Sequence, residues 1–171
     1  MVTYHEYIVK RKKKPLDYLI CFGSPFAALV VAYLLGGIIM TFLPILAFLV
    51  TPIWAACIWL CYRFITGTNQ EYEYLLTDCD LDVDKIINKN RRKRIISTYR
   101  KEIIAMAPVG SSNLPSGWEN LPKVEVCSDI KDEGVYVLIV SQDTQKAVYF
   151  QPTEKMIDTM VMRNPRKVFK D

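Results

Sequence analysis

The sequence lacks charge over one long internal stretch. Its 171 residues include 22 Lys and Arg and 18 Asp and Glu, yet no Lys, Arg, Asp, Glu or His occurs between Tyr18 and Tyr62. All charged residues therefore lie in the flanking segments. This distribution excludes a uniform soluble domain, a collagen-like chain and a disordered chain.

The sequence also lacks the residue sets of common catalytic and metal sites. His5 is the single histidine, and neither G-x-S-x-G nor the phosphate-binding G-x-x-x-x-G-K-[ST] occurs. The cysteines form no C-x-x-C pair, and we expect them to be small buried hydrophobes, with acylation of Cys21 as an alternative. They are Cys21, Cys57, Cys61, Cys79 and Cys127. We therefore expect no enzyme, and predict no catalytic, cofactor-binding or metal-binding residues.

The uncharged stretch predicts two membrane-spanning helices. As one helix it would extend about 68 Å, whereas the hydrocarbon core of a bilayer is roughly 30 Å thick. We place the helices at Leu16–Gly36 and Pro44–Tyr62, with Gly36-Gly37 and Pro44 forming the break. A rival register begins the first helix at Ser24-Pro25. A cleaved signal peptide is excluded because the apolar run is too long and no A-x-A site closes it.

Basic residues at the ends of the spans predict the orientation. Residues 10–14 are all Lys or Arg, Arg63 follows the second span, and the connecting loop has no charge. By the positive-inside rule, both termini of a two-span protein of the cell membrane then face the cytoplasm. The alternative, a nucleic-acid site at the basic run, is less favoured, and we expect no nucleic-acid partner.

Small residues recur every four positions in both predicted spans. Such residues let helices approach closely in lipid, either within one chain or in a homo-oligomer or partner complex. The predicted packing face comprises Ser24, Ala28, Ala32, Gly36, Ala47, Thr51 and Ala55. Apart from Asp17 at the start of the first span, neither span contains a charged residue or a histidine, which disfavours a transporter.

The remaining sequence predicts a mainly β domain. After an N-terminal arm (1–15), the hairpin (16–62) and a linker (63–69), apolar and polar residues alternate through residues 70–171. About seven strands are expected, at 72–76, 81–85, 92–99, 103–107, 123–127, 135–141 and 146–150, with hairpin turns at 132–134 and 142–145. A helix from Thr153, ended by Asn164-Pro165, would cap a bent sheet or barrel. Whether the arm with Tyr4, Tyr7 and Ile8 joins the sheet stays open, as does whether Trp118 covers the open end of the sheet, contacts a partner or enters lipid.

Seven short strands followed by a helix resemble the pleckstrin-homology (PH)-like fold. The chain is also similar to a small bacterial membrane-protein family of unknown function, through KKKP-x-D-Y, EYEY-x-LT, a basic hairpin, I-x-x-MAPVG and NPRKVF. These segments stand at Lys12–Tyr18, Glu71–Thr77, Asn88–Arg94, Ile103–Gly110 and Asn164–Phe169. The resemblance implies the architecture and brings no catalytic motif.

Two charged clusters stand out in the β domain. The basic cluster at the expected hairpin tip comprises Lys89, Arg91, Arg92, Lys93 and Arg94. It could contact anionic lipid headgroups or a membrane protein partner, or be a solvated face. Eukaryotic PH domains use a basic turn between their first two strands, whereas this one is expected between the second and third. The second cluster, Asp78, Asp80, Asp82 and Asp84, fails the EF-hand pattern and favours a polar strand face that pairs with the basic strand.

These observations favour a membrane-anchored, non-enzymatic binding or adaptor module. One alternative is a membrane enzyme that acts on lipid or envelope precursors through Asp17, Glu71 or Glu73, the acids nearest the membrane. Another is a self-assembling structural membrane protein.

Overall fold

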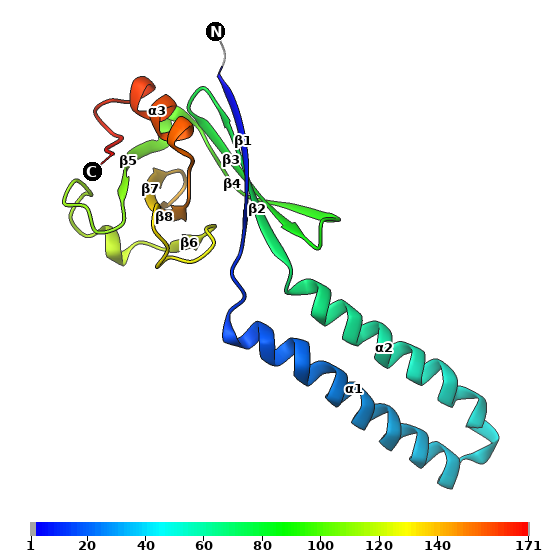
Figure 1. Cartoon of the computed structure of the whole chain (residues 1–171). Coiled ribbons are helices and arrows are strands. Elements are labelled where there is room, and N and C mark those ends of the chain that lie inside the picture. The colour runs from blue at the N-terminus through cyan, green and yellow to red at the C-terminus, as the bar shows by residue number, and fades with distance from the viewer. Residues whose placement is uncertain (1–2, 171) are drawn as a thin grey trace. The chain divides into compact units, whose positions relative to one another are not determined.

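The computed structural model describes residues 3–170 and divides into two compact units. The helical hairpin comprises residues 13–69. The β unit combines the N-terminal segment up to Lys12 with the chain from Gln70 onward (Figure 1).

The helical hairpin contains two helices that are long and apolar enough to cross a membrane. They are α1 (Pro15–Phe42) and the segment Pro44–Gly67, which consists of the 3-10 turn η1 (Pro44–Leu49) and helix α2 (Val50–Gly67). Asp17 closes the first turn of α1 because its Oδ2 accepts a hydrogen bond from the Lys14 backbone N–H at 2.8 Å. Pro15 also suits this turn, where its missing N–H has no helical partner.

The expected break was wrong at Gly36-Gly37 but right at Pro44, where the second apolar segment begins. Both glycines lie inside α1, and the chain turns at Leu43 instead. Gly36 is buried against α2, where an added Cβ would lie 3.5 Å from Val50 Cγ1 and 3.8 Å from Trp54 Nε1. Close helix packing therefore explains this glycine better than a turn does.

Two other helix boundaries also differ from the sequence predictions. Pro25 lies within α1, so the rival register that begins at Ser24-Pro25 was wrong. In addition, α2 continues through Arg63 to Gly67, which leaves only Thr68 and Asn69 where a linker over residues 63–69 was expected.

The predicted small-residue packing face is found in α1 but only in part in the second predicted span. In α1, Ala32 and Gly36 are buried and Ser24 Oγ lies 3.6 Å from Cys61 Sγ, while Ala28 lines the groove that α1 forms with α2. In the second predicted span, Thr51 and Ala55 are exposed and Ala47 lies in η1. The prediction assumed an α-helix from Pro44, but a 3-10 turn has three residues per turn and so changes the facing positions. Trp54, Cys57 and Cys61 line the grooves instead.

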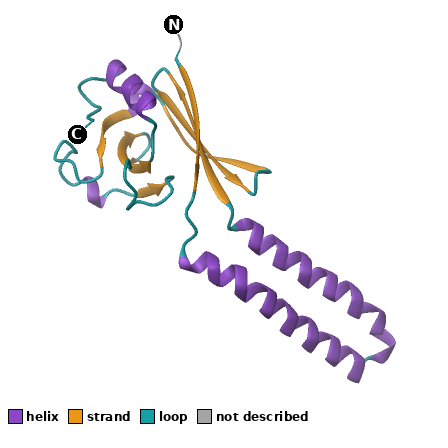
Figure 2. Cartoon of the chain, in the orientation of Figure 1, coloured by secondary structure: helices purple, strands orange, loops and turns teal. Residues whose placement is uncertain are grey.

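Residues 3–170 form eight strands arranged in two four-stranded sheets (Figure 2). The first sheet is antiparallel, in the order β1-β2-β3-β4, and the second has the order β5-β7-β8-β6. The first contains β1 (Tyr4–Lys10), β2 (Gln70–Thr77), β3 (Asp80–Ile87) and β4 (Arg91–Thr98). The second contains β5 (Ile103–Pro108), β6 (Lys123–Glu125), β7 (Tyr136–Ser141) and β8 (Gln145–Phe150).

All seven predicted strands are present, and the N-terminal arm adds an eighth. This arm forms β1, which pairs antiparallel with β2. The turn at 142–145 joins β7 to β8 as expected, but 132–134 is no hairpin turn because β6 pairs in parallel with β8. The single bent sheet that was expected is therefore two sheets.

The main core lies between the two sheets. Alternate side chains of both sheets meet helix α3 (Glu154–Arg163) in one buried cluster that includes Tyr74, Leu81, Phe150 and Met156. The Tyr74 hydroxyl donates a hydrogen bond to the Val126 carbonyl and accepts one from the Gln151 N–H at 3.3 Å. Burial accordingly raises the pKa of this phenol far above its usual range.

The other face of the second sheet is covered by the loop at 109–122. Leu114 is buried there, and the Trp118 ring lies 6.2 Å from the Tyr149 ring. Trp118 therefore covers a sheet face and not the open end. Cys79 and Cys127 are buried, as expected, whereas Cys21, Cys57 and Cys61 are only partly buried. Burial raises the pKa of the Cys127 thiol to about 11.

Helix α3 caps one end of the first sheet. Thr153 is its N-cap and accepts a hydrogen bond from the Met156 N–H. Arg163 forms an ion pair of 3.0 Å with Asp78 in the β2–β3 turn, and Thr159 Oγ1 lies 3.1 Å from His5 Nε2 near the start of β1. The opposite end of this sheet is consequently the one that carries the basic turn.

Candidate functional site

The basic turn lies at the end of the first sheet from which the chain leaves for the helical hairpin. Strand pairing aligns Lys10 with Glu71, Gln70 with Ile87, and Ile87 with Arg91. The last residue of β1, the first residue of β2 and the β3–β4 turn therefore share one end, which we call the linked end. The helical hairpin is an insertion between β1 and β2.

The turn holds a lysine in a backbone conformation that favours glycine. Asn88 and Lys89 have φ angles of +50° and +59°, and the Asn90 N–H donates to the Ile87 carbonyl at 3.2 Å. Tight hairpin turns need such angles, which asparagine and glycine adopt readily and lysine does not. A non-glycine residue held there costs about 1 kcal/mol or more, and residues of this kind cluster at functional sites.

The alternation of β4 divides the predicted basic cluster between two faces of the sheet. Lys93 pairs across the sheet with Lys85, and Lys85 pairs with Tyr72 of the main core. Arg91 and Lys93 therefore lie on the core side of the sheet, which we call the inner face. Arg92 and Arg94 lie on the outer face.

The outer-face arginines are engaged in ion pairs. Arg92 Nη1 lies 3.0 Å from Glu73 Oε2, while Arg94 lies 2.9 Å from Asp84 and 3.2 Å from Asp82. The predicted pairing of the aspartate row with the basic strand is thus observed. The other two aspartates have different partners. Asp80 accepts a hydrogen bond from the Arg100 backbone N–H, and Asp78 accepts hydrogen bonds from Thr3 and Arg163.

Glu73 is an unusual outer-face residue because its side chain is only 2% exposed. Burial raises the pKa of its carboxyl above the ordinary value, the Arg92 guanidinium opposes this rise, and the Glu6 carboxylate adds to it. A desolvated carboxylate beside an arginine explains this shift without a catalytic partner.

The inner face carries a group of cations, the inner-face cluster, formed by Arg11, Lys85, Arg91 and Lys93. Lys85 and Lys93 are direct cross-strand neighbours, and neither forms an ion pair within residues 3–170. Partial burial lowers the pKa of Lys85, and the charges of Arg11 and Lys93 lower it further. Like charges placed opposite each other destabilise a sheet, so a bound anion would relieve a repulsion that is already present.

The chain matches the family model of the bacterial PH-like domain (DUF6106) over residues 1–170. It belongs to this family. The bacterial PH-like part of the sequence resemblance is confirmed, and the β unit is called the PH-like domain below. Neither a curated protein nor a solved structure gives a significant match.

The PH-like domain places its basic turn between the third and fourth strands, since the arm supplies β1. The sequence placed this turn between the second and third strands. The connection between the first two strands, which binds phosphoinositides in eukaryotic PH domains, is occupied here by the helical hairpin.

Two members of the inner-face cluster, Arg11 and Lys85, were absent from the predicted site. Their proximity to Lys93 arises from strand pairing across distant segments, which a linear charge run does not reveal. The sequence contained one signal for Lys85. This residue continues the alternation of Leu81 and Val83, which places a lysine on the otherwise buried face of β3.

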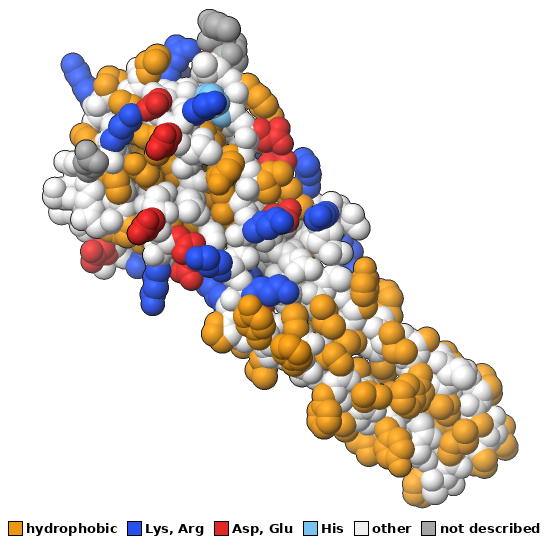
Figure 3. Space-filling model, viewed as in Figure 1, with side chains coloured by type: hydrophobic (Ala, Val, Ile, Leu, Met, Phe, Trp, Pro, Cys, Tyr) orange, Lys and Arg blue, Asp and Glu red, His pale blue; other side chains and the backbone are white. Residues whose placement is uncertain are grey.

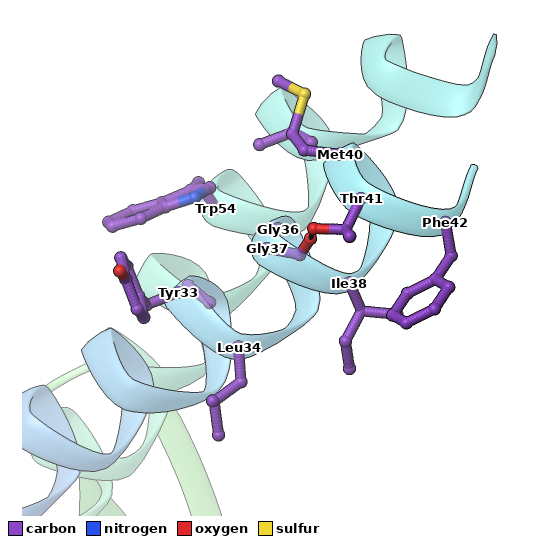
Figure 4. Close-up of a pocket in the computed structure, with 11 residues that line it drawn as sticks. Tyr33, Leu34, Gly36, Gly37, Ile38, Met40, Thr41, Phe42 and Trp54 are labelled. Atoms are coloured by element: carbon purple, nitrogen blue, oxygen red, sulfur yellow. Dashed lines mark hydrogen bonds between the residues drawn. The ribbon is translucent and has the colours of Figure 1, made fainter. Parts of the chain in front are cut away.

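The remaining candidates occupy other places. Asp17 caps α1, and Glu71 lies on β2 beside Lys10 of β1. In the helical hairpin, an open groove of about 480 Å³ is lined mainly by apolar groups that include Gly36, Met40 and Trp54 (Figure 4). The lining also includes the Tyr33 phenol and the Thr41 hydroxyl, but no carboxylate, amine or imidazole.

Proposed function

We propose that this protein is a membrane-anchored, non-enzymatic binding module that presents the linked end of its PH-like domain to the anionic inner leaflet of the cell membrane. The observation that carries the proposal is the position of the basic turn. It shares one end of the sheet with both chain connections to the two apolar helices.

The surface of the helical hairpin supports membrane insertion. Large apolar side chains are widely exposed on α1, η1 and α2, including Phe22 at 78%, Tyr33 at 75% and Ile45 at 90%. On the face shown in Figure 3, hydrophobic side chains cover the hairpin. Exposed apolar surface of this extent is unfavourable in water and favourable in lipid.

The distribution of charge supports a cytoplasmic PH-like domain. Residues 10–14 precede the first helix and Arg63 lies near the end of the second, whereas Leu43 and its neighbours carry no charge. Cytoplasmic flanks of membrane helices carry excess Lys and Arg. In this orientation both termini are cytoplasmic, and the anionic leaflet lies on the side of the basic turn.

The short connections favour contact between the linked end and the leaflet. Only residues 11–14 and 68–69 join the strands to the helices. A short tether raises the effective concentration of one site near another. Each basic group near an anionic membrane surface contributes roughly 1 kcal/mol, so a few such groups are enough for a stable contact.

Hydrogen–deuterium exchange of the full-length protein in nanodiscs tests this proposal. We expect slower exchange at residues 86–94 in nanodiscs that contain phosphatidylglycerol than in nanodiscs of phosphatidylcholine alone. Replacing Arg91, Arg92, Lys93 and Arg94 with serine should abolish the difference. Equal exchange of the parent protein in both lipids would contradict the proposal.

Affinity purification from native membranes tests the competing partner. The parent protein and the four-serine variant are purified in mild detergent, and bound proteins and lipids are identified by mass spectrometry. Loss of anionic lipid in the variant supports the proposal. A specific protein that is lost instead would make the basic end a protein-binding surface.

A further inference from the structure

We propose that the inner-face cluster binds the phosphate of an anionic lipid headgroup, whereas Arg92 and Arg94 serve the fold. This inference rests on the proposed function and names the ligand chemistry and the residues that recognise it. It also divides a basic run that is continuous in the sequence into a binding half and a structural half.

The strand register carries the first step of the argument. Lys85 and Lys93 are opposite each other, and Arg91 is two residues before Lys93, so the three share the inner face at the linked end. Val9 and Tyr72 pair directly, and both belong to the main core. Arg11 is two residues beyond Val9, and its backbone N–H bonds to the Gln70 carbonyl, which continues the same face. Four cations, from β3, β4 and the residue that follows β1, therefore converge on one small area.

The arrangement of charge partners carries the second step. On the outer face, each basic residue of β4 has a carboxylate within 3.2 Å. On the inner face, Lys85 and Lys93 have no such carboxylate within the part of the chain that the structure describes. Arg11 donates a hydrogen bond of 2.8 Å from Nη1 to Gln70 Oε1, which fixes its guanidinium near this end of the sheet.

Partial burial makes Lys85 the central residue of the cluster. Lys93 and Arg91 are exposed, whereas Lys85 is half-buried, so its ammonium has lost part of its hydration shell. A phosphate would restore hydrogen bonds to this group and separate it from the other cations. Several donors from different strands suit a phosphate, which offers several acceptor oxygens.

The linked end also supplies the reason to favour a lipid over free phosphate. Both connections to the helical hairpin leave from this end. With the hairpin in the bilayer, as in the proposed function, these short connections would keep the headgroups of the inner leaflet close to the cluster. The recognised chemistry is a phosphate on a net anionic headgroup such as phosphatidylglycerol. A zwitterionic headgroup would bring its own cation to the cluster.

Native mass spectrometry of the full-length protein in mild detergent tests this assignment, with phosphatidylglycerol as the probe. The test variant is Lys85→Gln with Lys93→Gln. The charge-matched control is Lys101→Gln with Lys155→Gln, which removes two exposed lysines outside the cluster. We expect the test variant to lose at least tenfold in affinity for phosphatidylglycerol, and the control to change less than twofold.

Further variants separate binding from folding. The single change Lys93→Gln is at an exposed position of an edge strand and should weaken binding without unfolding. Replacing both lysines with arginine should retain binding. Arg92→Gln with Arg94→Gln should lower the melting temperature but leave the affinity for phosphatidylglycerol within twofold of the parent.

Several results would overturn the assignment. If the Lys85 and Lys93 variants bind as well as the parent, the cluster is not the site, although the exchange experiment can still support the proposed function. The same holds if only the Arg92 and Arg94 variant loses binding. If millimolar inorganic phosphate displaces phosphatidylglycerol, the cluster takes free phosphate and the lipid assignment is wrong.

Discussion

At the scale of single residues, the buried Glu73 carboxyl makes the stability of the folded protein depend on pH. Its raised pKa means that the folded protein holds this proton more tightly than the unfolded chain does. As the pH rises above the ordinary value of 4.5, ionisation of Glu73 therefore weakens the folded state. This stabilisation is fully lost once the pH exceeds the pKa of Glu73 in the folded protein.

Glu73→Gln should remove this penalty. We expect the variant to melt about 4 °C above the parent at pH 7, which corresponds to roughly 1 kcal/mol in a domain of this size. The gap should narrow at pH 4, where the carboxyl of the parent is largely protonated. Thermal unfolding of the full-length protein at both pH values measures this, with Glu71→Gln as the charge-matched control. A variant less stable than the parent at pH 7 would show that the ion pair with Arg92 outweighs desolvation.

The basic cluster illustrates what residue-level sequence reasoning can supply. The run from Lys89 to Arg94 located the turn and its charge, because neighbouring residues in a sequence are neighbours in space. Which of these residues share a face with the core could not be predicted, since Val83 and Asp84 stand at a bulge that changes the register with β4. A bulge inserts one residue into one strand and so changes which positions share a face beyond it.

At the scale of elements, the two adjacent glycines of α1 have different surroundings. Gly36 is buried against Val50 and Trp54, whereas an added Cβ at Gly37 would meet no atom within 4 Å. Helix packing therefore restricts side-chain size at only one of the two positions.

Gly36→Leu should force α1 and α2 apart and lower the free energy of unfolding by about 1–3 kcal/mol. Gly37→Leu is the matched control, with the same substitution one residue away, and should change stability little. Thermal denaturation of the purified protein in detergent measures both. Equal loss in the two variants would indicate a general effect on the helix and not the packing of Gly36.

Strand β1 is an element that the sequence left undecided. Its alternation suits a strand, but its partner β2 begins only at Gln70, beyond both apolar helices. Local pattern therefore predicted the seven other strands and could not assign this one. For the same reason the division into two sheets was missed, because it depends on long-range pairing such as β6 with β8.

The role of β1 is testable by removing the helical hairpin in two ways. A protein that begins at Gln70 loses β1 and the core residue Val9, and should aggregate or unfold. A protein in which a short Gly-Ser linker replaces residues 13–69 keeps β1, and its ends are close because the Arg11 N–H lies 3.0 Å from the Gln70 carbonyl. We expect this second protein to be monomeric and folded in gel filtration and circular dichroism. Equal stability of the two proteins would show that β1 is dispensable.

At the scale of the whole molecule, the proposed orientation predicts opposite accessibility for two turns. Leu43 lies between the two helices, and Asp143 lies in the exposed turn between β7 and β8. Leu43→Cys should react with a membrane-impermeant maleimide in intact cells, whereas Asp143→Cys should react only after permeabilisation. The parent protein measures the background from its native cysteines. Labelling of Asp143→Cys in intact cells would contradict this orientation and indicate the opposite topology.

The insertion of the hairpin between β1 and β2 makes completion of the first sheet depend on events during synthesis. β1 leaves the ribosome before either apolar helix, and it must wait for a partner that follows both. Arg11 and Gln70 are 59 residues apart, and closing a flexible loop of that length costs roughly 4 kcal/mol. A formed hairpin removes most of this cost, because Cys21 Sγ and Thr68 Oγ1, near its two ends, lie 3.8 Å apart. Because β2 follows both helices in the chain, β1 stays unpaired until the whole hairpin has been synthesised and its two ends have come together.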